Sequence, residues 1–124
     1  MLGTTDIVAF LPTTDYEKAR AFFEGVLGLR FVSQDPYALV LDANGIMLRV
    51  TKVADHKPEQ YTILGWKVTE IDSVVAALEK KGVRFERYGF LEQDDRGVWT
   101  TPGGDKVAWF KDPDGNVLSL SQHV

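Results

Sequence analysis

An internal repeat constrains the fold of this chain more than any other feature of its sequence. At an offset of 54 positions, residues 19–31 fall on residues 73–85, and the two segments end in Gly-Leu-Arg-Phe and Gly-Val-Arg-Phe. At an offset of 70 positions, residues 41–50 fall on residues 111–120. Two copies of a unit of roughly 55 residues indicate a duplicated supersecondary motif, because a solenoid needs at least about three repeats.

The first copy predicts a strand, a helix and three further strands. Apolar residues at an i, i+3, i+4, i+7, i+8 spacing predict an amphipathic helix, capped by Thr14 or Asp15 and ended by Gly28. The Asp-Ala-Asn-Gly sequence at 42–45 suits a hairpin turn, since Asn and Gly tolerate a positive φ. The expected strands are residues 6–11, 29–33, 37–41 and 46–51, and the helical stripe is Ala19, Phe22, Phe23, Val26 and Leu27.

The second copy predicts the same order of elements, with an insertion at residues 89–106. Its helix carries Ile71, Val74, Val75 and Leu78 on one face and ends at Gly82. The expected strands are residues 61–68, 83–87, 107–111 and 116–122.

A charged segment with Pro58, residues 53–59, is expected to link the two copies. The prediction is therefore one α+β domain spanning residues 1–124, built from two βαβββ modules at 1–52 and 60–124.

Composition excludes several classes of function. The 124 residues include no cysteine, which excludes disulfides, zinc–thiolate sites and thiol nucleophiles. The formal charge is −4 and the basic residues do not cluster, which argues against a nucleic-acid partner. Apolar runs such as residues 7–11 are far shorter than the roughly 20 residues of a membrane span, and no export signal is visible. We therefore expect a cytoplasmic protein without a membrane partner.

The segment Val-Ala-Trp-Phe-Lys-Asp-Pro-Asp-Gly-Asn-Val-Leu at 107–118, together with the paired modules, resembles the vicinal-oxygen-chelate superfamily. This superfamily includes glyoxalase I, the bleomycin and fosfomycin resistance proteins and the extradiol dioxygenases. The resemblance covers nearly the whole chain. It implies curled sheets that form a cup with the helices outside, in an assembly that is often a homodimer.

The resemblance also indicates where metal ligands would lie. Family enzymes place a His or Glu on the first and last strand of each module, where a divalent ion acts as a Lewis acid. Arginine is permanently cationic and offers no lone pair to a metal, and valine, isoleucine and serine do not supply the imidazole or carboxylate. No metal and no other cofactor is therefore expected. The four family positions here are Val8, Arg49, Ile63 and Ser119.

Strand alternation then predicts the lining of the cup, which is mostly apolar and aromatic, as in small-molecule sites. Arg49 suits an anionic ligand, or it forms a structural pair with Asp6 or with a partner subunit's glutamate. Tyr37 and Trp109 stack on a planar ligand or belong to the core. The predicted ligand-binding residues are Phe10, Tyr37, Met47, Arg49, Lys67, Trp109, Ser119 and Ser121, and Leu39 and Val107 are expected on the same face.

Two further features remain open at this point. The insertion at 89–106, which holds Phe90 and Trp99, forms either a rim or lid over the cup or a solvated surface. Ser119 and Ser121 have no histidine at a comparable depth in the predicted fold, so a Ser-His-Asp triad is not expected.

The sequence favours a glyoxalase-like, metal-independent protein that binds an anionic or planar small molecule, of a sequestering or resistance type, working as a homodimer. Whether it is an enzyme stays open. One alternative is a metal-dependent lyase, isomerase or dioxygenase, if the ligand register differs or a partner subunit supplies ligands. Another is an interaction protein with a vestigial pocket.

Overall fold

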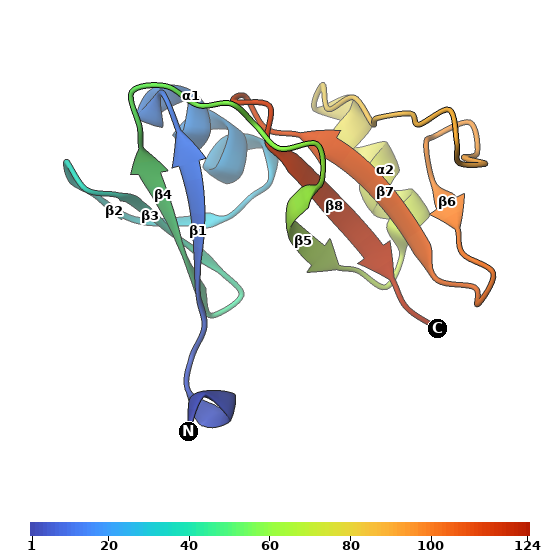
Figure 1. The fold of residues 1–124 in the computed structure, drawn as a ribbon, viewed down its shortest axis with the longest axis horizontal. Coiled ribbons are helices and arrows are strands. Elements are labelled where there is room, and N and C mark those ends of the chain that lie inside the picture. The colour runs from blue at the N-terminus through green and yellow to red at the C-terminus, as the bar shows by residue number, and fades with distance from the viewer. The chain divides into compact units, whose positions relative to one another are not determined.

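The computed structural model describes all residues 1–124 and forms two compact units, Met1–Lys57 and Pro58–Val124 (Figure 1). Each unit contains one four-stranded mixed sheet, with the orders β1-β4-β3-β2 and β5-β8-β7-β6. The expected fold of two duplicated βαβββ modules is confirmed. The units meet within the segment expected as a linker. No helix is long and apolar enough to cross a bilayer.

Unit 1 begins with a 3-10 turn, η1 (Leu2–Thr4). The Asp15 carboxylate caps the first helix, because it accepts hydrogen bonds from the backbone N–H groups of Glu17 and Lys18. Gly28, at φ +79°, ends the helical region in the left-handed conformation that glycine favours. The remaining elements are β1 (Val8–Thr13), α1 (Tyr16–Arg20), η2 (Ala21–Val26), β2 (Arg30–Gln34), β3 (Leu39–Ala43) and β4 (Ile46–Lys52).

The helix of unit 1 differs from the single α-helix that the apolar spacing predicts. After α1 the backbone widens into the π-helical segment η2, where the Leu27 N–H donates to the Phe22 carbonyl at 2.9 Å. Gly25 lies inside this segment and lowers its α-helical propensity. As a result only Ala19 and Phe23 of the predicted stripe are fully buried.

The core of unit 1 lies between its helical segments and one face of its sheet. Alternation along β4 buries Leu48 and Val50, which are 1% and 0% exposed, and turns Arg49 to the other face. The buried core residues are Leu11, Ala19, Phe23, Leu29, Leu39, Leu41, Leu48 and Val50.

Unit 2 repeats this plan, and α2 lies across one face of its sheet (Figure 1). Ile71, Val75 and Leu78 face the sheet from α2, as their helical spacing predicts. Their partners in the core include Ala108, Phe110, Leu118 and Leu120. The elements of unit 2 are β5 (Thr62–Lys67), α2 (Ile71–Lys80), β6 (Trp99–Thr100), β7 (Lys106–Lys111) and β8 (Val117–Gln122).

The Asp-Pro-Asp-Gly-Asn segment forms the turn between β7 and β8. The buried Asp112 carboxylate accepts hydrogen bonds from the backbone N–H groups of Asp114 and Asn116 and from the Asn116 side-chain amide, at 2.9–3.0 Å. Burial raises the pKa of Asp112, and these hydrogen bonds act in the opposite direction. The motif therefore serves the turn.

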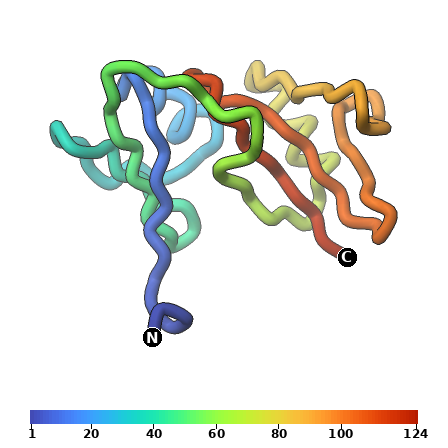
Figure 2. The backbone as a smooth tube through the Cα atoms, in the orientation of Figure 1, coloured from blue at the N-terminus to red at the C-terminus, as the bar shows by residue number.

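The prediction of a strand at 83–87 is wrong. Only Phe85 pairs there, with Phe110 of β7, and the Glu86 N–H donates to the Trp109 carbonyl at 2.8 Å. Further along the same edge of β7, Trp99 of β6 pairs with Val107. Residues 87–98 leave the sheet between these two pairings, as the yellow-to-orange path of the chain shows (Figure 2). We call this segment the excursion.

The excursion has a small counterpart in unit 1. There the pairing of β2 with β3 shifts by one residue between Phe31 and Ser33, which is a β-bulge. Both modules therefore interrupt the edge strand that follows the helix, unit 1 by one residue and unit 2 by a whole loop.

Candidate functional site

Each sheet has one face packed on its helix and one face without a helix, which we call the open face. Residues that pair directly across neighbouring strands share a face, so the register assigns them. On the open face of unit 1 lie Val8, Phe10, Val40, Asp42, Met47, Arg49 and Thr51. On the open face of unit 2 lie Gly65, Lys67, Val107, Trp109, Ser119 and Ser121.

The open face of unit 1 brings together three of the predicted residues. Arg49 pairs with Phe10 on one side and with Val40 on the other. Phe10 and Met47 are 63% and 41% exposed, although both are large apolar side chains. The guanidinium of Arg49 is thus set in an apolar surface, a setting in which an anionic partner is favoured.

Arg49 forms no hydrogen bond and no ion pair in the structure, so the expected structural pair with Asp6 is not formed. The charge of Arg49 nevertheless acts on the nearby Asp35 carboxylate. The backbone N–H groups of Tyr37 and Ala38 hold the pKa of Asp35 below its usual value, and Arg49 contributes a smaller lowering. Arg49 is therefore a cation available to a ligand.

The structure corrects the expected position of Leu39 and Tyr37. Leu39 pairs with Val50, and both are 0% exposed in the core beside the helix, so Leu39 lies on the face opposite to Arg49. Tyr37 precedes β3 in the turn after β2, is 78% exposed, and donates its backbone N–H to the Asp35 carboxylate at 2.7 Å. For Tyr37 the prediction extended the strand two residues too far, and for Leu39 it assumed a register with β4 that is off by one residue, because Val40 rather than Leu39 shares the face of Arg49.

The open face of unit 2 carries an aromatic cluster made of Tyr88, Phe90, Trp99 and Trp109. The Trp99 and Trp109 rings are stacked, with centroids 6.2 Å apart and planes 26° apart. Tyr88 meets Trp109 edge-on at 5.3 Å, and Phe90 lies 5.8 Å from Tyr88. Since Phe90 is 84% exposed, the cluster presents apolar aromatic surface to solvent.

Charged groups border this cluster. The Lys111 ammonium lies 3.4 Å from the Glu86 carboxylate. Burial, and to a lesser extent the Glu86 charge, raise the pKa of Tyr88, so its phenol is neutral at physiological pH and can donate a hydrogen bond.

Side chains within the excursion fix its shape. Gln93 accepts a hydrogen bond from the Tyr88 N–H at 2.7 Å and donates to the carbonyls of Glu86 and Gly97, at 2.9 and 2.7 Å. These bonds tie the start of the excursion to its end. The aromatic residues therefore project from an ordered loop.

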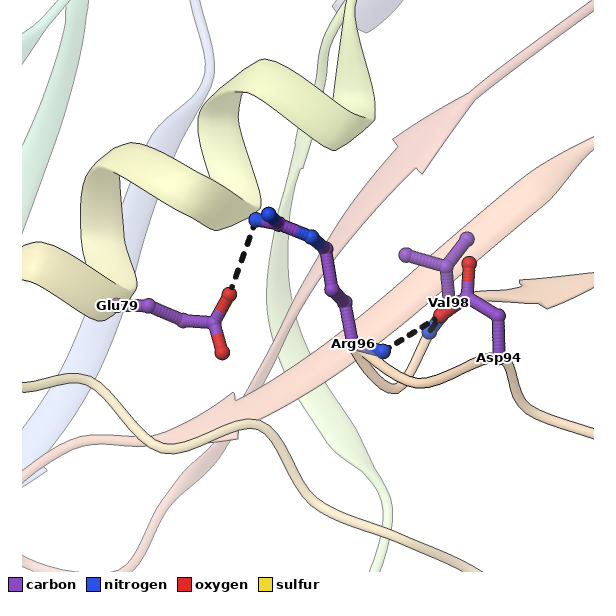
Figure 3. A network of polar contacts seen from close by, with 4 residues as sticks. All are labelled: Glu79, Asp94, Arg96 and Val98. Carbon is purple, nitrogen blue, oxygen red and sulfur yellow. Dashed lines mark hydrogen bonds and ion pairs between the residues drawn. The ribbon is translucent and has the colours of Figure 1, made fainter.

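A second set of contacts joins the excursion to α2. The Asp94 carboxylate accepts hydrogen bonds from the N–H groups of Arg96 and Val98, both at 2.9 Å. Figure 3 shows the Arg96 guanidinium reaching Glu79 of α2, at 3.3 Å. Asp94 therefore organises the loop and does not simply face solvent.

Sequence reasoning missed Tyr88 and treated Phe90 and Trp99 only as parts of a rim or lid. The signal that was available is the alternation of Tyr88 and Phe90, two positions apart in a polar, Gly-rich stretch. Trp109, by contrast, lies on the open face as predicted.

Two serines lie next to the aromatic cluster along β8. Ser119 pairs with Trp109 and with Gly65, and a side chain at Gly65 would place its Cβ 2.5 Å from the Ser119 hydroxyl oxygen. Gly65 is thus required for the close approach of β5 and β8. Ser121 pairs with Lys67, which shares the open face.

The expectation that no histidine reaches these serines is wrong. The Ser121 Oγ lies 2.9 Å from the His123 Nε2, and the His123 Nδ1 lies 3.4 Å from the Asp105 carboxylate. His123 continues the alternation of β8 beyond its last paired residue, and this brings it beside Ser121.

The four family positions for metal ligands carry no ligand set. Val8 and Arg49 lie on the open face of unit 1, Ser119 lies on that of unit 2, and Ile63 sits at a register shift in β5. No group of three or more His, Cys, Asp or Glu side chains that could hold a metal ion occurs in the structure.

A depression of about 610 Å³ lies within unit 2, between α2 and the excursion. Charged and small polar residues dominate its lining, with Asp72, Asp94, Asp95 and Arg96 among them. It lacks the apolar walls of a typical small-molecule site. The open faces are the better candidates.

Known structures share this fold over almost their full lengths. An antibiotic binding protein, TnmS3, from Streptomyces sp. CB03234 is 25% identical, with a TM-score of 0.76 over 100% of this chain and 99% of that chain. A superfamily member from Sphaerobacter thermophilus DSM 20745 is 24% identical, with a TM-score of 0.76 over 99% and 100%. A lactoylglutathione lyase from Agrobacterium tumefaciens is 16% identical, with a TM-score of 0.74 over 96% and 93%.

No curated protein matches the chain significantly in sequence. The model of one protein family, however, matches residues 5–120, which is nearly the whole chain and includes both modules. The chain therefore belongs to the Glyoxalase/Bleomycin resistance protein/Dioxygenase superfamily.

Proposed function

We propose that this protein binds a planar aromatic small molecule without a metal ion. The observation that carries the proposal is the aromatic cluster on the open face of unit 2. Four aromatic side chains from β6, β7 and the excursion converge there, and the most exposed of them, Phe90, has no core to join. A ligand that covers this surface would gain the free energy of apolar burial.

The geometry of the cluster favours a flat ligand. Trp99 and Trp109 lie 26° from parallel, and Tyr88 stands nearly perpendicular to Trp109. A flat ring can extend such a stack on one side and meet the edge of Tyr88 on the other, and both arrangements are attractive for aromatic pairs. Ser119, Ser121 and Lys67 supply hydrogen-bonding groups on the same face.

The open face of unit 1 offers a separate site, which fits an anionic small molecule. Arg49 is unpaired and flanked by Phe10 and Val40 on the open face of unit 1. A carboxylate or phosphate would satisfy its guanidinium, bidentately if it approaches in the plane.

Independence from metal follows from the side chains present. Arg49 would repel a divalent cation at the last strand of module 1, and Val8, Ile63 and Ser119 offer neither imidazole nor carboxylate. The fold neighbour TnmS3 is named an antibiotic binding protein, which supports a binding role for this type of fold.

The test is a calorimetric titration with a planar aromatic acid, anthracene-2-carboxylate, and with cyclohexanecarboxylate as the non-planar comparison. We expect the planar acid to bind, and its affinity to stay the same after dialysis against a chelator. Replacement of Trp109 by leucine should weaken binding by about two- to twelvefold, since an aromatic pair contributes about 0.5–1.5 kcal/mol beyond its burial.

Trp66→Phe is the matched control, because Trp66 stacks on Phe110 on the helix-facing side, with ring centroids 6.4 Å apart. It should leave the affinity unchanged. Equal affinity of the Trp109→Leu variant and the wild type, or no binding of the planar acid at all, would overturn the proposal.

We also propose that the protein works as a homodimer. On unit 1, Ile7, Val8, Phe10 and Met47 are 68%, 41%, 63% and 41% exposed, and a second copy that covers them would gain from apolar burial. Light scattering during gel filtration is expected to give twice the chain mass of 13.9 kDa. A single-chain mass at micromolar concentration would contradict it.

A further inference from the structure

Ser121, His123 and Asp105 form a chain of polar contacts at the end of β8. The Ser121 Oγ lies 2.9 Å from the His123 Nε2, and the His123 Nδ1 lies 3.4 Å from the Asp105 Oδ2. This order of groups, hydroxyl to imidazole to carboxylate, is the one that activates a serine as a nucleophile. The second distance is loose, as it often is in such sites before a substrate binds.

The sheet register explains why the three residues meet. Lys106 of β7 pairs with Gln122 of β8, so the preceding residue Asp105 lies opposite the following residue His123. Ser121 is two positions before His123 and therefore points to the same face. The arrangement follows from regular strand geometry at this end of the hairpin.

Backbone contacts fix the carboxylate. Asp105 Oδ1 accepts a hydrogen bond from the Val124 N–H at 2.9 Å, and the Asp105 N–H donates to the Thr101 hydroxyl at 3.1 Å. The Val124 N–H, with a smaller contribution from His123, holds the pKa of Asp105 below its usual value. A charged carboxylate only accepts hydrogen bonds, so it selects the tautomer with the proton on Nδ1 and leaves the Nε2 lone pair facing Ser121.

We propose that Ser121 is a nucleophile that takes an acyl group from activated aryl esters, with His123 as its general base and Asp105 as the residue that positions His123. The Ser121 Oγ bonds to the acyl carbon while its proton passes to Nε2. The bond from that carbon to the aryl oxygen breaks, and His123 returns the proton to this oxygen. Water then attacks the acyl-serine by the same route, which releases the carboxylic acid and restores the serine.

The surroundings of Ser121 suit this class of substrate. Lys67 pairs with Ser121 on the same face, so its positive charge is available near the oxyanion that forms. On the other side Ser121 pairs with Val107, which is also the partner of Trp99. The aryl group would lie toward the aromatic cluster, and this one element rests on the proposed function.

Diisopropyl fluorophosphate tests the nucleophile without an aryl group. In this reaction the Ser121 Oγ bonds to phosphorus, fluoride leaves, and the proton passes to His123. In the full chain without a C-terminal tag, we expect peptide mass mapping to place one diisopropylphosphoryl group on Ser121. Labelling should disappear in Ser121→Ala and fall by at least about tenfold in His123→Gln and Asp105→Asn.

Ser33→Ala is the matched control, since Ser33 is an exposed strand serine in the other unit, and its labelling should equal that of the wild type. His123 is exposed at the end of the chain, so its replacement leaves the fold intact, which a thermal melt checks. Absence of label on Ser121, or equal labelling of His123→Gln and the wild type, would overturn the proposal.

Hydrolysis of p-nitrophenyl acetate separates this proposal from the proposed function. We expect a burst of p-nitrophenol that Ser121→Ala lacks. Trp109→Leu should raise the KM for this ester, because the aryl group would lie toward the aromatic cluster. Loss of planar-acid binding with normal labelling would contradict only the binding function, and normal binding without labelling would contradict only the nucleophile.

Discussion

Gln93 and Tyr88 are joined by a hydrogen bond of 2.7 Å from the Tyr88 backbone N–H to the Gln93 side-chain oxygen. The nitrogen of the same amide donates to the carbonyls of Glu86 and Gly97. One side chain thus satisfies three backbone groups, at both ends of the excursion. This contact holds Tyr88, and with it the aromatic cluster, in place on the open face of unit 2.

Replacement of Gln93 by alanine should therefore lower the free energy of unfolding and weaken the binding of planar acids. Three hydrogen bonds at about 0.5–1.5 kcal/mol each set the scale, and water replaces part of them, so we expect a loss of about 2 kcal/mol. Urea unfolding followed by circular dichroism measures it. Gln60→Ala, at an exposed glutamine of the same unit, is the control and should stay within about 0.5 kcal/mol of wild type.

Removal of the unpaired guanidinium should affect anionic ligands alone. We expect Arg49→Ala to weaken the binding of an aromatic carboxylate to the open face of unit 1 by about 2–5 kcal/mol, and that of its neutral alcohol analogue far less. Calorimetric titration of both ligands gives the difference. Arg84→Ala, at an exposed arginine of unit 2, should bind both as the wild type does, and a similar loss for acid and alcohol would contradict the role of Arg49.

The turn at Asp35 should make the stability of the protein depend on pH. The N–H groups of Tyr37 and Ala38 depress the pKa of Asp35 in the folded state. Its contribution to stability is therefore present above the ordinary aspartate pKa of about 3.9 and is lost as the pH falls through the lower, folded value.

Comparison of the wild type with Asp35→Asn measures this contribution. The wild type should be the more stable protein at pH 6, and the difference in the free energy of unfolding should shrink as the pH is lowered from 5 to 2.5. A difference that stays constant over this range would show that the carboxylate charge plays no part.

Alanine substitutions at two glycines with positive φ distinguish the stability cost of backbone strain from that of packing. Gly28→Ala, at φ +79° with no other atom within 4 Å of the position its Cβ would take, should cost about 1–2 kcal/mol from the left-handed conformation alone. Gly115→Ala, at φ +83°, should cost more, since its Cβ would lie 3.1 Å from the Pro58 Cγ. Chemical denaturation of both variants checks the order, and equal costs would show that Pro58 yields freely.

The alternation of side chains predicted most of the fold. Hydrophobic pattern and turn residues predicted strands close to β1, β4, β5, β7 and β8. Strand alternation, counted from the positions that the family resemblance implied, placed on open faces Phe10, Met47, Arg49, Trp109, Ser119, Ser121 and Lys67. That these residues bind a ligand stays a prediction. The turn role of the Asp112 segment also followed from its residue types.

The incorrect predictions share a physical cause. In each case the backbone pairing is set by contacts distant in sequence or by single side chains. The π-helical turn at Phe22 changes a hydrogen-bond register without changing the apolar spacing. The loss of the strand at 83–87 depends on Gln93, and the place of Tyr37 depends on where the pairing of β3 begins. His123 reaches Ser121 because alternation continues past the last paired residue, into a segment that the pattern treated as a tail.

In unit 2, the pairing of the sheet edge and the surface that contacts a ligand depend on different residues. Phe85 and Trp99 keep the edge of β7 paired, so residues 87–98 can change in length or composition while the sheet below them stays the same. A library that varies only these positions would then change ligand preference on a constant scaffold, much as hypervariable loops do on an antibody domain. Module 1 thus keeps a nearly continuous edge strand, whereas module 2 carries a loop that can diversify.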